Sequence, residues 1–414
     1  MEQRRKNLTQ LFIPICLETL LYMLSGMVDT LMLSSVNDQA VGAVGTANTY
    51  IGIFIIMFSV ISSGMVAVMT QNIGAGRPGV AYQARQLGLV FNAALGVIMS
   101  LFLSLGAGTI LSGVGVADAL MQPAKTYLQI VGGFCILNAL IPICSSYLRA
   151  FGFSKEPLYA SIIGNVINFC LNAFFLFVLH KGVAGVATAT VISRIINLVI
   201  VVLLGAVLVK AKQHPERESN RAVMGQIIRI GLPSACETAI YNVSMTLVIR
   251  FLNQMDAQGL NVTARSYTMQ ITNFSYCVGA ALAQANAIMT GWHIGAKEYD
   301  ACDRGTKKAA VIGVIVAVIL ETVFTLCSGW IMQLFSKDPQ MVSLVGKLLA
   351  IDIVLEIGRV TNLVYGQALK TSGDAVFPVV MGACFMILCS VGGNVSVWNP
   401  SGPSGRGRIH RYDW

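Results

Sequence analysis

Long apolar stretches alternate with short polar ones along most of the chain. Eleven of them are long enough, or nearly so, to cross a bilayer as a helix, which takes about 20 mostly apolar residues. They cover residues 8–34, 40–70, 86–112, 124–148, 157–180, 183–209, 227–252, 259–291, 309–333, 341–369 and 376–393. A β-barrel would show short strands that alternate apolar with polar residues. The pattern therefore predicts an all-α polytopic membrane protein.

Composition supports this prediction. Of the 414 residues, 55% are hydrophobic and 11% are charged, whereas a soluble domain has about 25% charged residues. The formal net charge of +9 would suit nucleic acid, but the lysines and arginines lie between the apolar segments, where membrane topology requires them. We therefore expect the lipid bilayer as a partner and no nucleic acid.

Basic residues are divided unequally among the connections. The N-terminus and the connections after even-numbered segments hold seventeen lysines and arginines, and those after odd-numbered segments hold three, with Arg250 as a debatable fourth. The positive-inside rule then predicts that the N-terminus and the even connections are cytoplasmic. The expected location is the bacterial plasma membrane, crossed many times.

The second half of the chain repeats the first. IPICLET at 13–19 returns as LPSACET at 232–238, an offset of 219, and LRAFGFSKEP at 148–157 returns as LKTSGDAVFP at 369–378, an offset of 221. Parallel repeats with a site between them are a known transporter plan. We predict two six-helix repeats, a 12-helix plan of which eleven spans are present. The predicted parts are an N-terminal lobe 1–208, a cytoplasmic linker 209–226, an incomplete C-terminal lobe 227–393 and an aberrant tail 394–414.

The tail departs from the repeat. Residues 394–414 are polar and rich in Gly, Pro and Arg, where the repeat leads us to expect a twelfth helix matching residues 182–202. A shifted reading frame or an incomplete gene would produce this ending, and a genuine alternative ending is the other possibility. We expect the tail to lack regular packing, and we expect a chain without the twelfth helix to export little.

Carboxylates interrupt the first apolar segment. Glu18 and Asp29 lie eleven residues apart, about three helical turns, so they share a face. A carboxylate in the middle of a spanning helix costs roughly 2.5–3.5 kcal/mol to insert, so we expect both to face a protein interior or a wet cavity. Glu18 and its counterpart Glu237 each follow a proline by four residues. Two interpretations stay open: these acids recognise a cation in a central cleft, or they pack helices near the cytoplasmic end.

A second group of charges lies in the tenth segment. Glu356 and Arg359 are three residues apart on one helix face and can pair. Asp352 lies one turn earlier and can join them. A structural salt bridge and a role in the substrate cleft are both compatible with this spacing.

Several blocks resemble the multidrug and toxic compound extrusion (MATE) family. They are IPICLETLLYMLSGMVDTLMLS, TQNIGAGR, LRAFGFSKEPLYASIIGNVINFCLN and GVAGVATATVISR, with GLPSACET and ALKTSGD in the second half. The resemblance covers about residues 5–390. It implies twelve helices in two six-helix lobes, and export of organic cations and drugs by antiport with Na⁺ or H⁺, without ATP.

The resemblance also implies an ion-coupling site. Asp29 stands at the acidic position of the family's first helix, Asn168 and Asn172 at a polar pair of the fifth, and Thr190 at a threonine of the sixth. Carboxylate and amide oxygens suit a hard cation, so Asp29, Asn168 and Asn172 are candidate Na⁺ ligands, and an Asp in a dry lobe can instead carry protons. A hydrogen-bonded polar cluster that only holds helices together is the alternative.

The second lobe differs from the family pattern. Tyr241 and Arg359 stand where some members have acids on helices 7 and 10, so the second ion site of those members is not expected here. The remaining candidates for the substrate cleft are Glu18, Glu237, Glu356 and Arg359.

No enzyme motif accompanies these features. The chain holds no Walker motif, HExxH or GxSxG, and GAGRPG at 74–79 follows no predicted strand. We therefore expect no enzyme and no cofactor beyond the coupling ion. The prediction is a monomeric secondary antiporter that exports organic cations by alternating access. A flippase for a lipid-linked substrate, which would favour a broad basic cavity, and a non-transporting truncated remnant are the alternatives.

Overall fold

A computed structural model describes residues 6–35, 38–113, 116, 118–209, 216–255, 260–333, 338–386 and 388. Within these ranges all regular structure is helical. The helices are α1 (Leu8–Ser34), α2 (Asp38–Gly74), α3 (Pro78–Gly113), α4 (Asp118–Tyr127), α5 (Ile136–Ala150), α6 (Lys155–Ala173), α7 (Gly182–Leu208), α8 (Asn220–Met255), α9 (Leu260–Gly295), α10 (Tyr299–Leu326), α11 (Ser328–Met332), α12 (Pro339–Ser372) and α13 (Val376–Phe385). Two π-helical turns, η1 (Leu128–Gly132) and η2 (Phe174–Val178), continue α4 and α6.

Each predicted apolar segment overlaps a helix. Five helical segments are long and apolar enough to cross a membrane, namely α1, α3, α6 with η2, α7 and α10, and two bent pairs bring the number to seven among the described residues. The helices α8, α9 and α12 are as long but more polar. They carry ionisable or amide side chains within the span, such as Glu237, Asn286 and Glu356, which lower their hydropathy without shortening them.

Helix α8 extends into the predicted linker. Helix α8 begins at Asn220, inside the predicted linker 209–226. Arg, Ala, Met and Gln have good helix propensity, and Val223 is fully buried against the core, so the helix extends beyond its apolar part. The tail 394–414, and the end of the eleventh segment beyond residue 388, lie outside the described residues.

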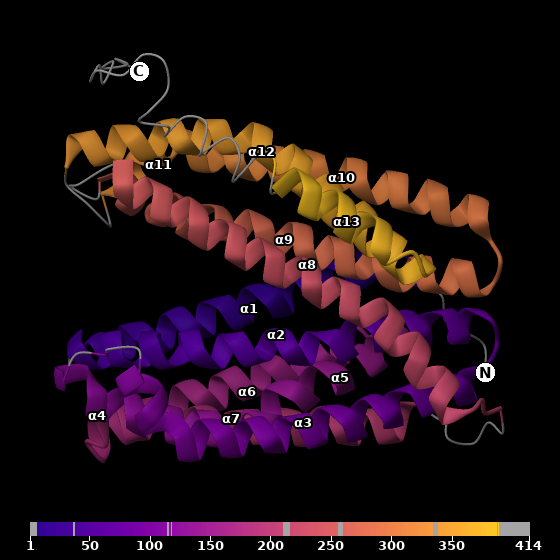
Figure 1. Ribbon diagram of the computed structural model, residues 1–414, viewed down its shortest axis with the longest axis horizontal. Coiled ribbons are helices and arrows are strands. Elements are labelled where there is room, and N and C mark those ends of the chain that lie inside the picture. The colour runs from indigo at the N-terminus through magenta and orange to yellow at the C-terminus, as the bar shows by residue number, and fades with distance from the viewer. Residues whose placement is uncertain are drawn as a thin grey trace.

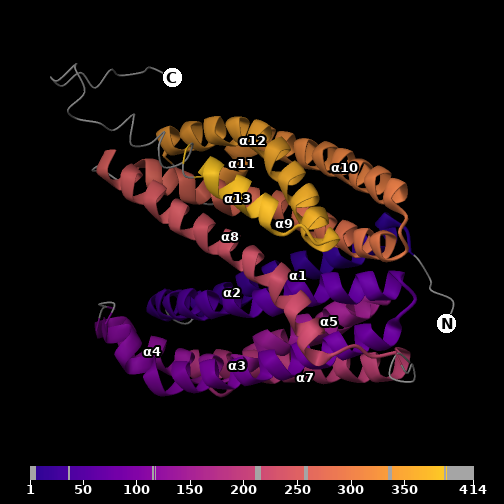
Figure 2. The same ribbon diagram turned by 45° about the vertical axis from the view of Figure 1, so that its right-hand side comes forward.

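The helices form two groups (Figures 1 and 2). In Figure 1 helices α1 to α7, indigo to magenta, lie below α9, α10, α12 and α13, orange to yellow, and α8 crosses obliquely from one group to the other. We call the groups the first and second lobe. One buried apolar cluster contains residues of both, among them Leu11, Met65, Ile227 and Trp292. This cluster joins the lobes near the start of α1 and the end of α2.

Turns of unusual backbone geometry recur at the repeat offset. Gly76 and Lys297 both have positive φ, 74° and 63°, as do Gly152 and Gly373, with 87° and 109°. In each pair the second residue lies 221 positions after the first. Left-handed backbone is uncommon, above all for a residue other than glycine, so its recurrence indicates that the turns after α2 and α9, and after α5 and α12, have the same shape.

Candidate functional site

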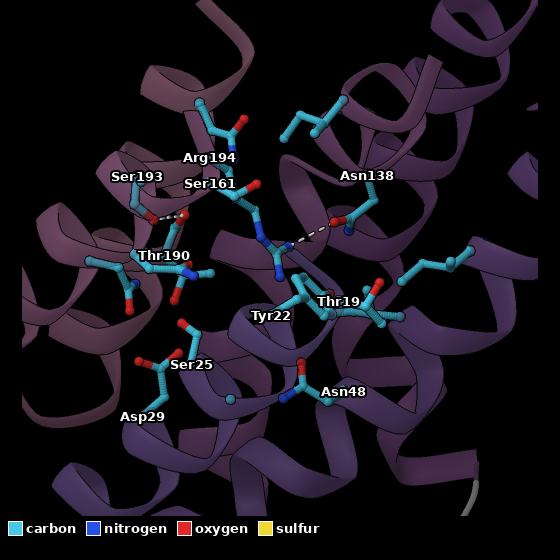
Figure 3. Close-up of a pocket in the computed structure, with 18 of the residues that line it drawn as sticks. Thr19, Tyr22, Ser25, Asp29, Asn48, Asn138, Ser161, Thr190, Ser193 and Arg194 are labelled. Carbon is cyan, nitrogen blue, oxygen red and sulfur yellow. Dashed lines mark hydrogen bonds between the residues drawn. The ribbon is translucent and has the colours of Figure 1, made fainter. Parts of the chain in front are cut away.

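A cavity of about 740 Å³ lies mainly within the first lobe, between α1, α2, α5, α6 and α7. Gln284 of α9 contributes to its wall from the second lobe. Figure 3 shows polar side chains from several helices around this space. The charged lining residues are Glu18, Asp29, Arg149 and Arg194. Glu18 and Asp29 therefore share a face as their spacing predicts.

Asp29 is hydrogen-bonded to one of the two asparagines of α6. The buried face of α6 runs through Ala160, Gly164, Asn168 and Asn172 at helical spacing, so the two amides continue an otherwise small, apolar stripe. The Asn172 amide nitrogen donates to Asp29 Oδ1 at 2.6 Å and to Asn168 Oδ1 at 3.2 Å. Asn172 is fully buried, and its Oδ1 has no hydrogen-bond partner. A buried acceptor without a partner is costly, and the nitrogen of this same amide bonds the Asp29 carboxylate.

Thr190 lies on the same cavity wall but bonds elsewhere. Its hydroxyl donates to the Val186 carbonyl at 2.9 Å and not to Asp29. One turn further along α7, Arg194 donates to Asn138 Oδ1 at 2.9 Å, as Figure 3 shows. Arg194 is not among the site residues that the sequence predicts. Its position in an apolar segment was the signal that could have marked it as a cavity residue.

Glu18 is paired. Arg149 at the end of α5 donates to Glu18 Oε2 at 2.5 Å and to Gln284 Oε1 of the second lobe at 3.3 Å. In the second lobe Glu237 pairs with Lys370. These two ion pairs are related by the repeat, because Glu237 follows Glu18 by 219 residues and Lys370 follows Arg149 by 221. Glu18 and Glu237 thus each have a basic partner at the end of a neighbouring helix.

The structure does not bring Glu237, Glu356 and Arg359 to this cavity, whose lining omits all three. Arg359 donates to Glu356 Oε2 at 2.6 Å and to Asp352 Oδ1 at 3.3 Å, so the predicted pairing along α12 is present. Tyr241 is 45% exposed on α8.

The lobes meet closely at one end of the bundle, where the turns after α2 and α9 lie. The Gln71 amide nitrogen donates to the Thr371 carbonyl at 2.5 Å, and Trp292 Nε1 donates to the Ala150 carbonyl at 2.9 Å. The first lobe donates one of these bonds and the second lobe donates the other. Trp292 follows Gln71, and Thr371 follows Ala150, by the repeat offset of 221.

Glycines permit this approach. A Cβ on Gly74 would lie 2.2 Å from the Trp292 carbonyl oxygen, and a Cβ on Gly295 would lie 1.9 Å from the Gln71 carbonyl oxygen. No side chain can occupy either position while the contact is made. We call the two hydrogen bonds and these two glycines the lobe contact.

Two helical lobes related by a parallel repeat are a plan that many secondary transporters have. The MatE family model matches residues 14–174 and again 233–395, so the chain belongs to the MatE family. It is a multi-pass membrane transporter and not an enzyme.

Individual relatives agree with this membership. An uncharacterized transporter of Bacillus subtilis, YisQ, is 33% identical over 89% of this chain and 82% of its own length. A probable multidrug resistance protein NorM of Thermotoga maritima is 22% identical over 91% and 82%. A solved structure, described as the outward-facing conformation of a multidrug resistance MATE family transporter, superposes with a TM-score of 0.84 at 16% identity over 93% and 86% of the two chains. This likeness concerns the fold.

Proposed function

We propose that the protein exports organic cations and drugs in exchange for Na⁺ or H⁺, across a bacterial plasma membrane with the N-terminus inside. The observation that carries the proposal is the charge arrangement of the cavity. Its described lining has two acids and two arginines, but Glu18 is already paired with Arg149. Asp29 is the lining carboxylate without a salt bridge, and it is therefore the group that attracts a cation.

The residues around Asp29 fit a hard cation. Asp29 supplies a carboxylate, and Asn172 supplies a buried carbonyl oxygen whose acceptor capacity is unused. Oxygen donors of these types are the ligands that hard cations prefer. A proton on Asp29 would serve the same purpose, because it also removes the negative charge.

Competition for this charge gives exchange. An organic cation gains most from the cavity while Asp29 is ionised, and an ion bound at Asp29 cancels that gain. Arg194, on the same wall, then adds repulsion toward a second cation. Binding of the coupling ion and binding of the drug therefore oppose each other, as linkage requires of an antiporter. One charge crossing 100 mV supplies about 2.3 kcal/mol, and one pH unit about 1.36 kcal/mol.

The test is Asp29→Asn, measured as efflux of a fluorescent organic cation from cells lacking other exporters. We expect efflux to be lost while the protein still reaches the membrane, since Asn168 and Asn172 are neutral. Asp118→Asn makes the same chemical change at an exposed residue of α4 and is the control that should retain efflux. Efflux by Asp29→Asn with unchanged dependence on Na⁺ and pH would overturn the site assignment.

A further inference from the structure

The buried face of α12 contains two carboxylates at positions expected for apolar residues. Asp352 is 7% exposed and Glu356 is fully buried. They continue a stripe spaced by three or four residues, the spacing of one helix face. The other members of this stripe are Val345, Leu349, Val360 and Val364.

Helix α10 contributes a third carboxylate in the same way. Glu321 is fully buried and follows Gly313 and Ala317 along the buried face of α10. Carboxylate oxygens of Glu321, Asp352 and Glu356 all lie within 4.8 Å of one another. The three acids form a polar layer between two apolar clusters of the second lobe.

The described neighbours leave this layer partly unbonded. Arg359 engages one oxygen of Glu356 and one of Asp352, and the Ser275 hydroxyl donates to the other Glu356 oxygen at 3.3 Å. Both oxygens of Glu321 and Oδ2 of Asp352 are buried without a hydrogen-bond partner. With all three acids ionised, one guanidinium faces three negative charges. Burial of uncompensated charge is expensive, so the layer calls for further positive charge.

The geometry points to a metal cation. Hard cations such as Ca²⁺ bind oxygen at about 2.3–2.6 Å, so ligands on opposite sides of the ion lie up to about 5 Å apart. Because the three carboxylate oxygens lie within 4.8 Å of one another, one such ion can reach all of them. We propose that Glu321, Asp352 and Glu356 bind a hard metal cation inside the second lobe, with the Ser275 hydroxyl as a neutral oxygen beside it.

The site is a property of the second lobe. At the repeat offset of 221, the first lobe has Ser100, Val131 and Cys135, none of which supplies a carboxylate. The proposed ligands are also separate from Asp29 and from the cavity lining. The proposal therefore goes beyond the exchange function and does not depend on it.

The experiment uses the purified full chain in detergent, carrying Asp29→Asn so that the cation site proposed at Asp29 is removed. Thermal unfolding is followed in Na⁺, Ca²⁺, Mg²⁺ and N-methylglucamine at constant ionic strength, and radioactive Na⁺ or Ca²⁺ measures binding directly. We expect one of Na⁺ and Ca²⁺ to raise the unfolding midpoint and to bind once per chain. Mg²⁺ should have a smaller effect, because it demands shorter octahedral bonds.

Glu321→Gln and Asp352→Asn are then added singly. Each should weaken binding of that ion by about tenfold or more, since even loss of an outer partner of a metal ligand has an effect of this size. Asp303→Asn, an exposed acid near the start of α10, should leave binding unchanged. If a variant does not fold, the ion titration of the parent protein still decides the question.

Two results would overturn the proposal: no bound Na⁺ or Ca²⁺ in the parent protein, which would mean that protons or packing neutralise the acids, or undiminished binding after loss of Glu321 and Asp352. Neither result involves transport. A failure here is therefore distinct from a failure of the Asp29 assignment, which is judged by efflux.

Discussion

The lobe contact predicts that one added methyl group, at Gly74 or Gly295, shifts the equilibrium of the transporter toward the conformation in which the lobes are apart at this end. Gly74→Ala places a Cβ 2.2 Å from the Trp292 carbonyl oxygen and 2.8 Å from its Cα and carbonyl carbon, and Gly295→Ala places one 1.9 Å from the Gln71 carbonyl oxygen. All of these are backbone atoms of packed helices, which cannot move aside as a flexible side chain would. The overlap is relieved when the lobes separate at this end.

The size of the effect follows from the cost of overpacking. Extra groups forced into a well-packed region typically cost about 1–3 kcal/mol. Because the cost falls only on the conformation in which this end is closed, the balance between closed and open forms should move by roughly 5- to 150-fold. The same change at Gly52 of α2, whose Cβ would meet nothing within 4 Å, should have no such effect.

The assay is a distance distribution between spin labels on the two lobes. Labels at Arg77 and Tyr299, both exposed near the lobe contact, are attached after the native cysteines are replaced. The unmodified glycines should give a short distance, and Gly74→Ala or Gly295→Ala should add a longer one. Gly52→Ala should match the unmodified chain. Unchanged distributions in both contact variants would refute the claim that this contact closes one side.

Two further outcomes follow from the charges. Glu18→Gln leaves Arg149, whose side chain is 10% exposed, without its carboxylate partner, and it should destabilise the protein by about 3 kcal/mol. In thermal unfolding, the double variant Glu18→Gln with Arg149→Gln should recover part of this loss. Strictly additive losses of the two single variants would contradict the pairing. Single cysteines are placed at Ser219 or Gln340 in a chain without the native cysteines and treated in intact cells with an impermeant thiol reagent. The cysteine at position 219 should be shielded, and the one at position 340 should react. The reverse pattern would contradict an internal N-terminus.

The helical segments could be predicted from the sequence because their signal is local. Apolar runs predict helices wherever they occur, and the predicted segment 8–34 has the same bounds as α1. Helix α8 begins inside the predicted linker because residues 220–226 are polar yet helical. Polarity marks the exit from the bilayer, whereas helix propensity and packing determine where the helix begins.

Pairing between distant helices was harder to predict. Asn172 was matched to Asp29 through the family pattern, but neither periodicity nor composition connects Glu18 with Arg149 or Arg194 with Asn138. These contacts depend on how α1, α5 and α7 pack. The run from Gly74 to Gly79 lacks the preceding strand of a nucleotide-binding motif. Its first glycine instead allows the close approach of the lobes at the lobe contact.

The central claim is that a bound ion at Asp29 exchanges for an organic cation. The most direct measurement is uptake of a labelled organic cation into liposomes containing the purified protein, with Na⁺ and pH gradients imposed separately. The account predicts that an outward gradient of one of these ions drives uptake, and that Asp29→Asn abolishes the response while Asp118→Asn keeps it. Uptake that ignores both gradients, or that persists in Asp29→Asn with the same ion dependence, would contradict it.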